Sequence, residues 1–459
     1  MRISKKNMLI TIMVLICTIL AGIITQMSNN ELYHVLSIWI IVIITILVSK
    51  FDLLHPYFWF TSFFALYSTA YTIILIQGFQ TNIGYTSDNS LLTILALATI
   101  IVIIGPPKNS TTYIQSNKTI EISSNDSKIN RDLLQKILIV LIVILIACVI
   151  VISQIGIQKK SELVSNRYFS FRLATYLVRY ITLYVSLYIV SSTKNIKLGS
   201  IVIFSGISVL LFTLFTAERD GIFRFILVVV ASLFATKRIS RKTLPLVIGI
   251  SGVAVVILSY LKYFFVSGQV RTGFNDNGLI YNFLNSDFAA AGENMQVLLN
   301  NPWTNSYFNY SIILNDLLAP FTFVFKSFNV GSWFNDTFYY GSYSRAFTLL
   351  GQGYVIGGYI GVILLFIVVS TIVKVLYKRS GINFYWLTTY IYMIATVASS
   401  FRGNLSSIIE TLIRIPFVGL LGFFMLRLLI VKKRKSTFKI NSKIQRDYRL
   451  KDSHMEELF

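Results

Sequence analysis

The chain has 459 residues, of which 55% are hydrophobic and only 13% are charged, and its formal net charge is +22. A soluble domain usually carries about 25% charged residues, so this composition excludes an ordinary globular protein and indicates a polytopic helical membrane protein. Continuous apolar runs also exclude a membrane β-barrel, whose strands alternate apolar and polar residues. The positive charge does not indicate a nucleic-acid partner, because Lys and Arg gather in the cytoplasmic loops of membrane proteins.

Twelve apolar segments are predicted to cross the membrane as α-helices. Such a helix needs about 20 apolar residues to span roughly 30 Å of hydrocarbon. The first segment follows a basic start and is too long for the apolar part of a signal peptide, so we interpret it as a spanning helix. The fourth and eighth are short, which is typical of helices that are broken or enclosed by protein and water. The predicted helices are 8–25, 32–48, 57–76, 90–104, 134–152, 173–191, 200–216, 222–236, 244–264, 349–373, 383–400 and 408–431.

The positions of Lys and Arg predict the orientation of these helices. With the N-terminus in the cytoplasm, most of the 41 Lys and Arg residues fall in inner loops and the C-terminal tail, whereas the outer loops 26–31 and 77–89 contain none. This bias marks the cytoplasmic side, so both termini are expected there. The chain then divides into a membrane domain at 1–264 with helices 1–9, a large extracytoplasmic loop at 265–348, a second membrane domain at 349–431 with helices 10–12, and a basic cytoplasmic tail at 432–459.

The large outer loop is the stretch in which a substrate would be handled. It is rich in aromatic and amide side chains, among them Trp303, Tyr307 and Trp333. Aromatic rings stack on the C–H faces of sugars, and amides and carboxylates bond sugar hydroxyls, so this composition favours a glycan ligand. Trp and Tyr also gather at membrane interfaces, which leaves an interfacial role open.

Several arginines lie in the outer loop or at the outer ends of predicted helices, where cations are not expected. An intramembrane Arg costs a few kcal/mol unless it pairs or lines a polar cavity. The planar guanidinium binds phosphate in a bidentate manner, so we expect these residues to hold a lipid-linked pyrophosphate. The candidates are Arg167, Arg172, Arg219, Arg224, Arg271, Arg345 and Arg402. Pairing with acids is the alternative, since Asp220 and Arg224 are spaced i, i+4 on one helix. Glu410 and Arg414 have the same spacing.

A general base in this protein is expected to be a carboxylate. The three histidines are His34, His55 and His454, all outside the outer loop, so neither a His base nor a His-based metal site is expected there. Cys17 and Cys148 fall inside apolar segments, which predicts no disulfide and no metal site. The catalytic candidates are Glu218, Asp220 and Glu293, and the sequence does not choose between them and Asp276, Asp287, Asp316 and Asp336.

Three short stretches resemble motifs of O-antigen and capsular polysaccharide repeat-unit polymerases of the Wzy type. The first, Tyr343 to Val362, is similar to the place where an outer loop re-enters the membrane through a Gly-rich helix start, with Gln352 where the family often has Glu. The second, Ala217-Glu-Arg-Asp-Gly, is similar to an Arg-Gly turn between two helices. The third, Ser400-Phe-Arg-Gly-Asn, is similar to an Arg-Gly motif before the last helix.

The resemblance implies an all-α polytopic glycosyltransferase of GT-C-like architecture, with about 12 transmembrane helices, in the bacterial cytoplasmic membrane. It would use no cofactor, and would transfer the growing glycan from undecaprenyl pyrophosphate to the terminal sugar of a new lipid-linked oligosaccharide. The implied partners are these lipid-linked oligosaccharides, membrane lipid, a chain-length regulator and a flippase, but no nucleic acid. Two alternatives stay open: a lipid-linked oligosaccharide flippase or transporter, and an O-antigen ligase, whose family uses an outer-loop His that this chain lacks.

Overall fold

The protein is built from α-helices. The computed structural model describes residues 5–78, 83–107, 124–155, 168–192, 199–216, 218–247, 249, 284, 287–321, 329–340 and 347–429. No strand occurs among these residues. Within the same ranges, eight helices are long and apolar enough to cross a membrane. The chain is therefore an all-α, multi-pass membrane protein.

The helices fall into three groups along the chain. The first group is α1 (Lys5–Met27), α2 (Glu31–Val48), α3 (Pro56–Ile76), α4 (Asp88–Ile104), α6 (Ser124–Ile155), α8 (Phe169–Ser191), α9 (Gly199–Thr216) and α10 (Arg219–Ala235). The second group, called the outer segment because it lies in the predicted outer loop, contains α13 (Asp287–Leu299), η1 (Pro302–Thr304), α14 (Ser311–Leu317), η2 (Ala319–Phe321) and α15 (Val330–Phe338). The last group is α16 (Leu349–Arg379), α17 (Phe384–Ser400), α18 (Leu405–Leu412) and the π-helical turn η3 (Ile413–Phe417).

Polar caps fix where several of these helices begin. The Asn383 side chain accepts a hydrogen bond from Trp386 N (2.9 Å) at the start of α17. The His55 ring accepts one from Tyr57 N (3.2 Å) at α3, where Pro56 occupies the first position. Such caps satisfy backbone N–H groups that have no partner inside the helix, and Pro needs none there. The caps therefore set the helix starts within a residue or two of the predicted ones.

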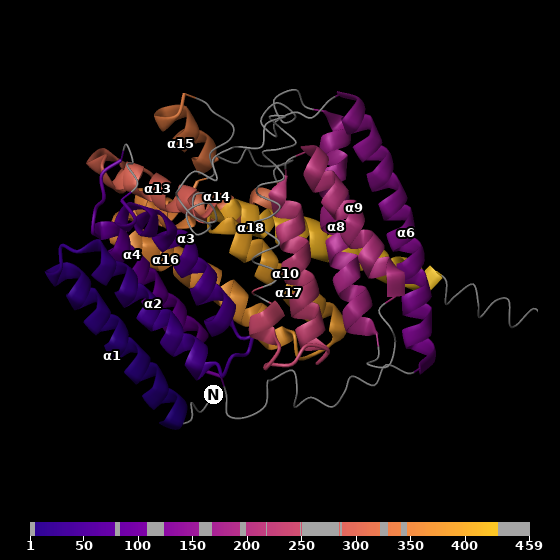
Figure 1. Ribbon diagram of the computed structural model, residues 1–459, viewed down its shortest axis with the longest axis horizontal. Helices are drawn as coiled ribbons and strands as arrows, with labels where there is room; N and C mark the ends of the chain where they lie inside the picture. The colour runs from indigo at the N-terminus through magenta and orange to yellow at the C-terminus, as the bar shows by residue number, and fades with distance from the viewer. Residues whose placement is uncertain are drawn as a thin grey trace, which may run out of the picture.

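Two hydrophobic cores lie side by side in the bundle. One is formed mainly by α1–α4, α13, α16 and α17, and the other mainly by α6, α8 and α9. Helix α10 contributes to both cores, and the cores meet where α10 and α17 pack against each other and against α8 (Figure 1). The outer segment covers one end of the bundle, opposite the end where the chain begins. The start of α10 and the end of α17 therefore lie at the end of the bundle on which the outer segment lies.

Helix α16 is broken near its start. Gly357 and Gly358 have non-helical backbone angles, and Gly358 has φ 57° and ψ −135°. A Cβ at Gly361 would lie 2.2 Å from the carbonyl oxygen of Gly353, although residues eight apart in a straight helix are separated by about 12 Å. The short piece 349–356 therefore folds back against the long piece 359–379. The sequence predicted one continuous helix at 349–373, which is wrong in this detail. We call 349–356 the re-entrant piece, after the loop re-entry that the resemblance predicts.

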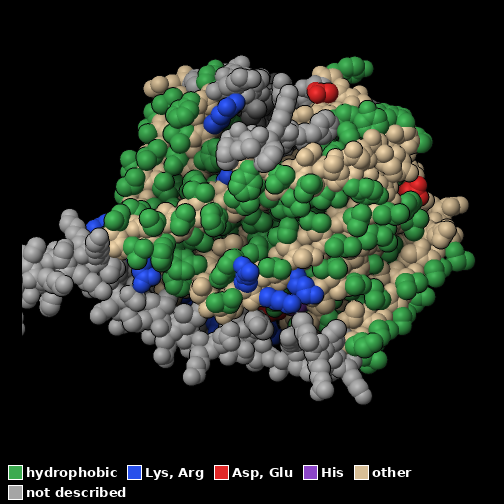
Figure 2. Space-filling view, turned by 180° about the vertical axis from the view of Figure 1, so that it is seen from behind, with side chains coloured by type: hydrophobic (Ala, Val, Ile, Leu, Met, Phe, Trp, Pro, Cys, Tyr) green, Lys and Arg blue, Asp and Glu red, His purple; other side chains and the backbone are tan. Residues whose placement is uncertain are grey.

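The surface matches a protein surrounded by lipid. Large hydrophobic side chains are exposed along α1, α6 and α9, among them Ile19, Val143 and Ile203. Figure 2 shows one apolar face, with most of the visible Lys and Arg side chains gathered along the edge away from the outer segment. An apolar band bordered by cations is typical of a membrane protein whose basic loops mark one side.

Eight of the twelve predicted spans coincide with described helices that are long and apolar enough to cross a membrane. Helices α4, α10 and α17 coincide with three more, but each has only 17 residues, so the number of twelve stays a prediction. Helices α1 and α6 begin before the predicted residues 8 and 134, respectively. Most of the predicted ninth span, 244–264, lies outside the described residues. The predicted last span, 408–431, is an apolar segment from Leu405 to Leu429 that contains the π-helical turn at Pro416, because Pro cannot donate a helical hydrogen bond.

Candidate functional site

The turn between α17 and α18 connects several parts of the outer end of the bundle. Phe401 is buried, and its carbonyl oxygen accepts a hydrogen bond from Leu349 N (3.0 Å) at the start of the re-entrant piece. Asn404 caps α18 through Ser407 N (3.1 Å) and also donates to Asn329 Oδ1 (3.4 Å), which caps α15. Main-chain and capping hydrogen bonds therefore hold the turn independently of its one charged residue.

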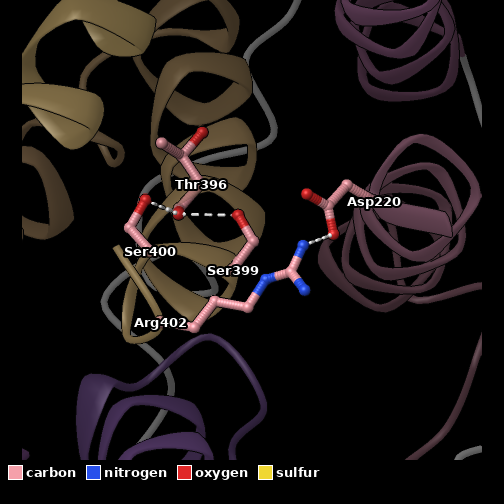
Figure 3. Close-up of polar contacts among 5 residues, drawn as sticks. All are labelled: Asp220, Thr396, Ser399, Ser400 and Arg402. Atoms are coloured by element: carbon pink, nitrogen blue, oxygen red, sulfur yellow. Dashed lines mark hydrogen bonds and ion pairs between the residues drawn. The ribbon is translucent and has the colours of Figure 1, made fainter. Parts of the chain in front are cut away.

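That charged residue, Arg402, forms an ion pair with Asp220. Its Nη2 atom contacts Asp220 Oδ1, and the two side chains are 14% and 26% exposed (Figure 3). The hydroxyl groups of Ser399 and Ser400 beside it donate to the carbonyl oxygen of Thr396 (3.0 and 2.7 Å). Because the ion pair is partly shielded from water, it is screened less than a surface pair. It joins α10 to the α17–α18 turn, across the boundary between the two hydrophobic cores.

Carboxylates are concentrated at the start of α10. Glu218 occupies the N-cap position and is buried, and its backbone N–H donates to Thr216 Oγ1 (3.3 Å). Asp220 lies in the first turn. Negative side chains are favoured there because the helix dipole and the unpaired N–H groups are positive at this end. Glu218 and Asp220 are thus both carboxylates held at the outer end of the boundary.

The predicted i, i+4 ion pair between Asp220 and Arg224 is replaced by a longer-range one. Asp220 pairs with Arg402, 182 residues away in sequence, although its charge still acts on Arg224. Arg224 is half-buried, and its Nε and Nη1 atoms are enclosed without a hydrogen-bond partner. A buried donor without a partner costs about 1–3 kcal/mol, and more when it is charged. Arg224 therefore keeps donor groups with which it can bind an anion.

Polar side chains from three helices lie near Arg224. Arg179 of α8 and Tyr392 of α17 both interact electrostatically with it, as does Glu218. The Arg179 guanidinium also lies over the Tyr176 ring, 5.8 Å from its centroid. Neighbouring guanidinium groups repel each other, and an anion placed between them removes that repulsion. We call Arg179, Arg219, Arg224, Arg402, Glu218 and Asp220 the arginine cluster; its cations outnumber its carboxylates.

The other predicted pair, Glu410 with Arg414, is confirmed. Arg414 Nη1 contacts Glu410 Oε1 on the same helical face. Tyr180 of α8 donates to the backbone carbonyl of Arg414 (3.0 Å). Arg414 is thus committed to a local carboxylate. Arg402 is not part of this helical face, because it lies in the turn before α18 begins.

The remaining predicted site residues lie partly in this cluster and partly elsewhere. Arg172 is exposed on the first turn of α8, and Arg219 is half-buried at the first position of α10. Glu293 is half-buried on α13, which packs mainly against α3 rather than at the α10–α17 boundary. Arg167, Arg271 and Arg345 lie outside the described residues. The structure therefore brings together Glu218, Asp220, Arg219, Arg224 and Arg402 of the predicted set, and adds Arg179 and Tyr392.

A buried polar contact that the sequence did not single out lies beside the turn. Asp316 of α14 and Gln352 of the re-entrant piece are both fully buried. Gln352 Nε2 donates to Asp316 Oδ2, and Gln352 Oε1 accepts from Leu405 N (2.7 Å). Burial raises the pKa of Asp316 to about 6, although hydrogen bonds from Gln352 and the Ser406 backbone oppose the rise. A carboxylate in this environment is anchored rather than solvated.

Aromatic side chains form an outward-facing group on the outer segment. Trp303 and Tyr307 are 50% and 52% exposed. Trp303 stacks on Phe338 (centroids 5.8 Å apart) and Tyr307 on Trp333 (5.2 Å). The loop that carries them is attached to the end of the re-entrant piece by a backbone hydrogen bond from Phe308 N to Val355 O (2.8 Å). These rings can stack on sugars or lie at the membrane interface.

Comparison of this chain with protein-family models, with curated proteins and with solved structures finds no match. Among the described residues, no group of three or more His, Cys, Asp or Glu side chains is arranged to hold a metal ion. The arginine cluster, the outer segment and the sequence motifs are therefore the features that bear on function.

Proposed function

We propose that this protein polymerises the lipid-linked repeat units of a bacterial surface polysaccharide, as a Wzy-type glycosyltransferase with about 12 spans and both termini in the cytoplasm. The growing glycan is transferred from undecaprenyl pyrophosphate to a hydroxyl of the terminal sugar on a second lipid-linked unit. The bond between the anomeric carbon and the pyrophosphate breaks, a glycosidic bond forms, and the proton of the hydroxyl is released. The reaction takes place on the outer face of the cytoplasmic membrane.

The observation that carries this proposal is the arginine cluster at the boundary between the two cores. It contains an excess of cations at the end of the bundle covered by the outer segment, and Arg224 has enclosed donors without partners. Arg binds phosphate oxygens with several parallel hydrogen bonds, and a low-dielectric setting strengthens them. A pyrophosphate carries several negative charges, which would balance the excess positive charge of this cluster. Its lipid tail would extend along the apolar sides of the helices.

The ion pair of Arg402 with Asp220 suggests how binding is linked to catalysis. A pyrophosphate that attracts Arg402 competes with Asp220 for the guanidinium. Asp220, once released, is a carboxylate near the leaving group that can accept the proton of the acceptor hydroxyl. Arg224 and Arg402 would stabilise the negative charge that develops on the departing pyrophosphate. Glu218 is the second candidate for the base. Glu293 is not favoured, because it lies on α13, away from the arginine cluster.

A flippase or transporter for lipid-linked oligosaccharides is the second candidate, because such a protein also needs cations that face a lipid pyrophosphate. The folded outer segment, with its aromatic group and the re-entrant piece, favours the polymerase, since a transporter has no need to hold an acceptor sugar outside the membrane. A ligase is less favoured because none of the three histidines occurs in the outer loop. A chain-length regulator and a flippase are the protein partners that a polymerase would require.

The test is deletion of the gene in its source organism, followed by analysis of surface glycan. The proposal expects surface glycan limited to a single repeat unit. Complete loss of surface glycan would instead indicate a flippase, and long polymer retained on the carrier lipid would indicate a ligase. Full-length surface polymer after deletion would contradict the proposal. Purified protein in lipid nanodiscs, supplied with the native lipid-linked repeat unit, should yield a ladder of longer lipid-linked glycans and free undecaprenyl pyrophosphate.

A further inference from the structure

The re-entrant piece 349–356 lies between the outer segment and the α17–α18 turn. Its entry is bonded to the turn through Leu349 N and Phe401 O (3.0 Å). Its exit is bonded to the aromatic loop, where Ser306 N donates to Tyr354 O (3.3 Å) and Phe308 N to Val355 O. The Gly357–Gly358 break lets the piece turn away from the rest of α16. It is thus a separate short element with attachments at both ends.

The side chain of Gln352 fixes this piece from two directions. Its amide nitrogen donates to the carboxylate of Asp316, and its amide oxygen accepts from Leu405 N (2.7 Å). Leu405 is the first residue of α18, three positions after Arg402. A buried amide with both ends bonded can take only one orientation, because rotating it would place donor against donor and acceptor against acceptor. The contact therefore sets the position of the turn as well as that of the piece.

We propose that Asp316 and Gln352 are positioning residues, which hold the re-entrant piece against the α17–α18 turn and so set where Arg402 lies relative to Asp220. This inference rests on the proposed function for its catalytic consequence, but its structural part stands independently. Asp316 and Gln352 act through Arg402 and do not contact the substrate. The outer segment and the arginine cluster are thereby mechanically linked, since Asp316 belongs to α14 of the outer segment.

A purely structural explanation makes different predictions. Two buried polar groups of this kind can often be replaced by well-packed apolar ones without loss of stability. A directional polar contact instead selects one geometry, and a displacement of about 1 Å at a catalytic group can lower the rate about a hundredfold. The proposal therefore expects large effects on activity that follow hydrogen-bond polarity rather than side-chain volume.

The decisive experiment exchanges the acid and the amide. Asp316→Asn leaves an amide opposite the Ser406 N–H and Gln352, and Gln352→Glu places a carboxylate against Asp316. In Asp316→Asn/Gln352→Glu, the new amide at 316 can donate to the new carboxylate at 352 and accept from Ser406 N, while the carboxylate still accepts from Leu405 N. The polymerisation rate of each single variant at pH 8 should be at least tenfold lower than that of the native protein. The rate of the double variant should be within about threefold of the native rate.

The matched control is Gln296→Glu. Gln296 is also a fully buried glutamine of the outer segment, and its Oε1 accepts from Thr86 N (2.8 Å). It lies on α13, away from the α17–α18 turn, so this variant should lose stability but keep its rate within about twofold. In an Arg402→Lys background, adding Gln352→Glu should lower the remaining rate by less than threefold, because both changes act on the same group.

Hydrogen exchange in nanodiscs without substrate gives a readout that does not depend on the reaction. Peptides covering 400–410 should exchange their amide hydrogens faster in both single variants and at the native rate in the double variant. The hydrogen exchange of α2 should be the same in all of them. The proposal is overturned if the single variants keep the native polymerisation rate and native hydrogen exchange. It is also overturned if the double variant polymerises no faster than the single variants, or if Gln296→Glu lowers the polymerisation rate as much as they do. If the native protein does not polymerise glycan, the proposed function fails, and hydrogen exchange alone decides the positioning role.

Discussion

Arg402, in the turn between α17 and α18, pairs with Asp220 in the first turn of α10, and this contact joins the two hydrophobic cores at their outer ends. The pair is partly buried, so both charges are partly shielded from water. It is also the point at which the outer segment, through the Asn404–Asn329 contact, reaches the arginine cluster. A ligand that breaks this pair would therefore change the packing of α10 against the α17–α18 turn.

Breaking this ion pair should damage activity more than stability. Asp220→Asn keeps the side-chain volume but removes the charge, which should cost about 1–2 kcal/mol of unfolding free energy for a partly buried pair. It should lower the polymerisation rate at least a hundredfold if Asp220 accepts the proton. The measurements are thermal unfolding and glycan synthesis in nanodiscs. Glu410→Gln, which breaks the more exposed pair with Arg414, is the control and should change the rate less than threefold.

Removing the charge of Arg224 should separate stability from anion binding. Arg224→Met replaces a guanidinium with enclosed, unpartnered nitrogens by an apolar chain of similar length, so unfolding should become no easier. A ligand that binds the native state raises the melting temperature. Inorganic pyrophosphate should therefore stabilise the native protein and fail to stabilise this variant. Arg379→Met, which removes a guanidinium lying over Trp386 at the opposite end of the bundle, should keep the pyrophosphate response. An unchanged response in Arg224→Met would remove Arg224 from the site.

Local patterns in the sequence predicted local structure well. Apolar runs located the described spanning helices because a helix must satisfy its own backbone groups in lipid. The i, i+4 spacing of Glu410 and Arg414 correctly predicted their contact. The same rule failed for Asp220 and Arg224, because Arg402, remote in sequence, lies close enough to compete for the carboxylate.

Long-range polar contacts were not visible in the sequence. Gln352 was noted only as a departure from an acidic position, and Asp316 was one of several outer carboxylates. Their contact depends on the fold of α16 at Gly357–Gly358, which brings residues 36 positions apart into one buried site. Arg179 was not among the predicted site residues, because its proximity to Arg224 arises from the packing of α8 against α10.

The buried carboxylate of Asp316 should make stability depend on pH. Burial raises its pKa from 3.8 to about 6, so the native state holds the proton more tightly than the unfolded chain. Between pH 4 and 6 the unfolded chain releases this proton first, and the free energy of unfolding should fall as pH rises, by about 3 kcal/mol at most, and then level off.

Two other buried groups titrate in the same range. The pKa of Asp52 is also raised to about 6 by burial, whereas burial lowers the pKa of His55 to about 3 and gives the opposite slope. The difference between native protein and Asp316→Asn isolates the Asp316 contribution. Measured by thermal unfolding from pH 4 to 8, native stability should decrease relative to the variant until about pH 6.5. A difference that is constant with pH would show that the Asp316 carboxyl is not shifted.

The break in α16 should require glycine at position 358. Its φ of 57° with ψ of −135° is a conformation that residues with a Cβ rarely adopt, and the added Cβ would lie 2.6 Å from Asn305 Oδ1. Gly358→Ala should therefore cost about 2–3 kcal/mol, or force the re-entrant piece out of place, with loss of polymerisation and faster hydrogen exchange at 347–356. Gly422→Ala is the control: a Cβ there meets no atom within 4 Å, and Ala favours a helix, so this variant should match or exceed native stability. Native activity and exchange in Gly358→Ala would mean that the backbone can avoid the break and that the re-entrant geometry is not needed.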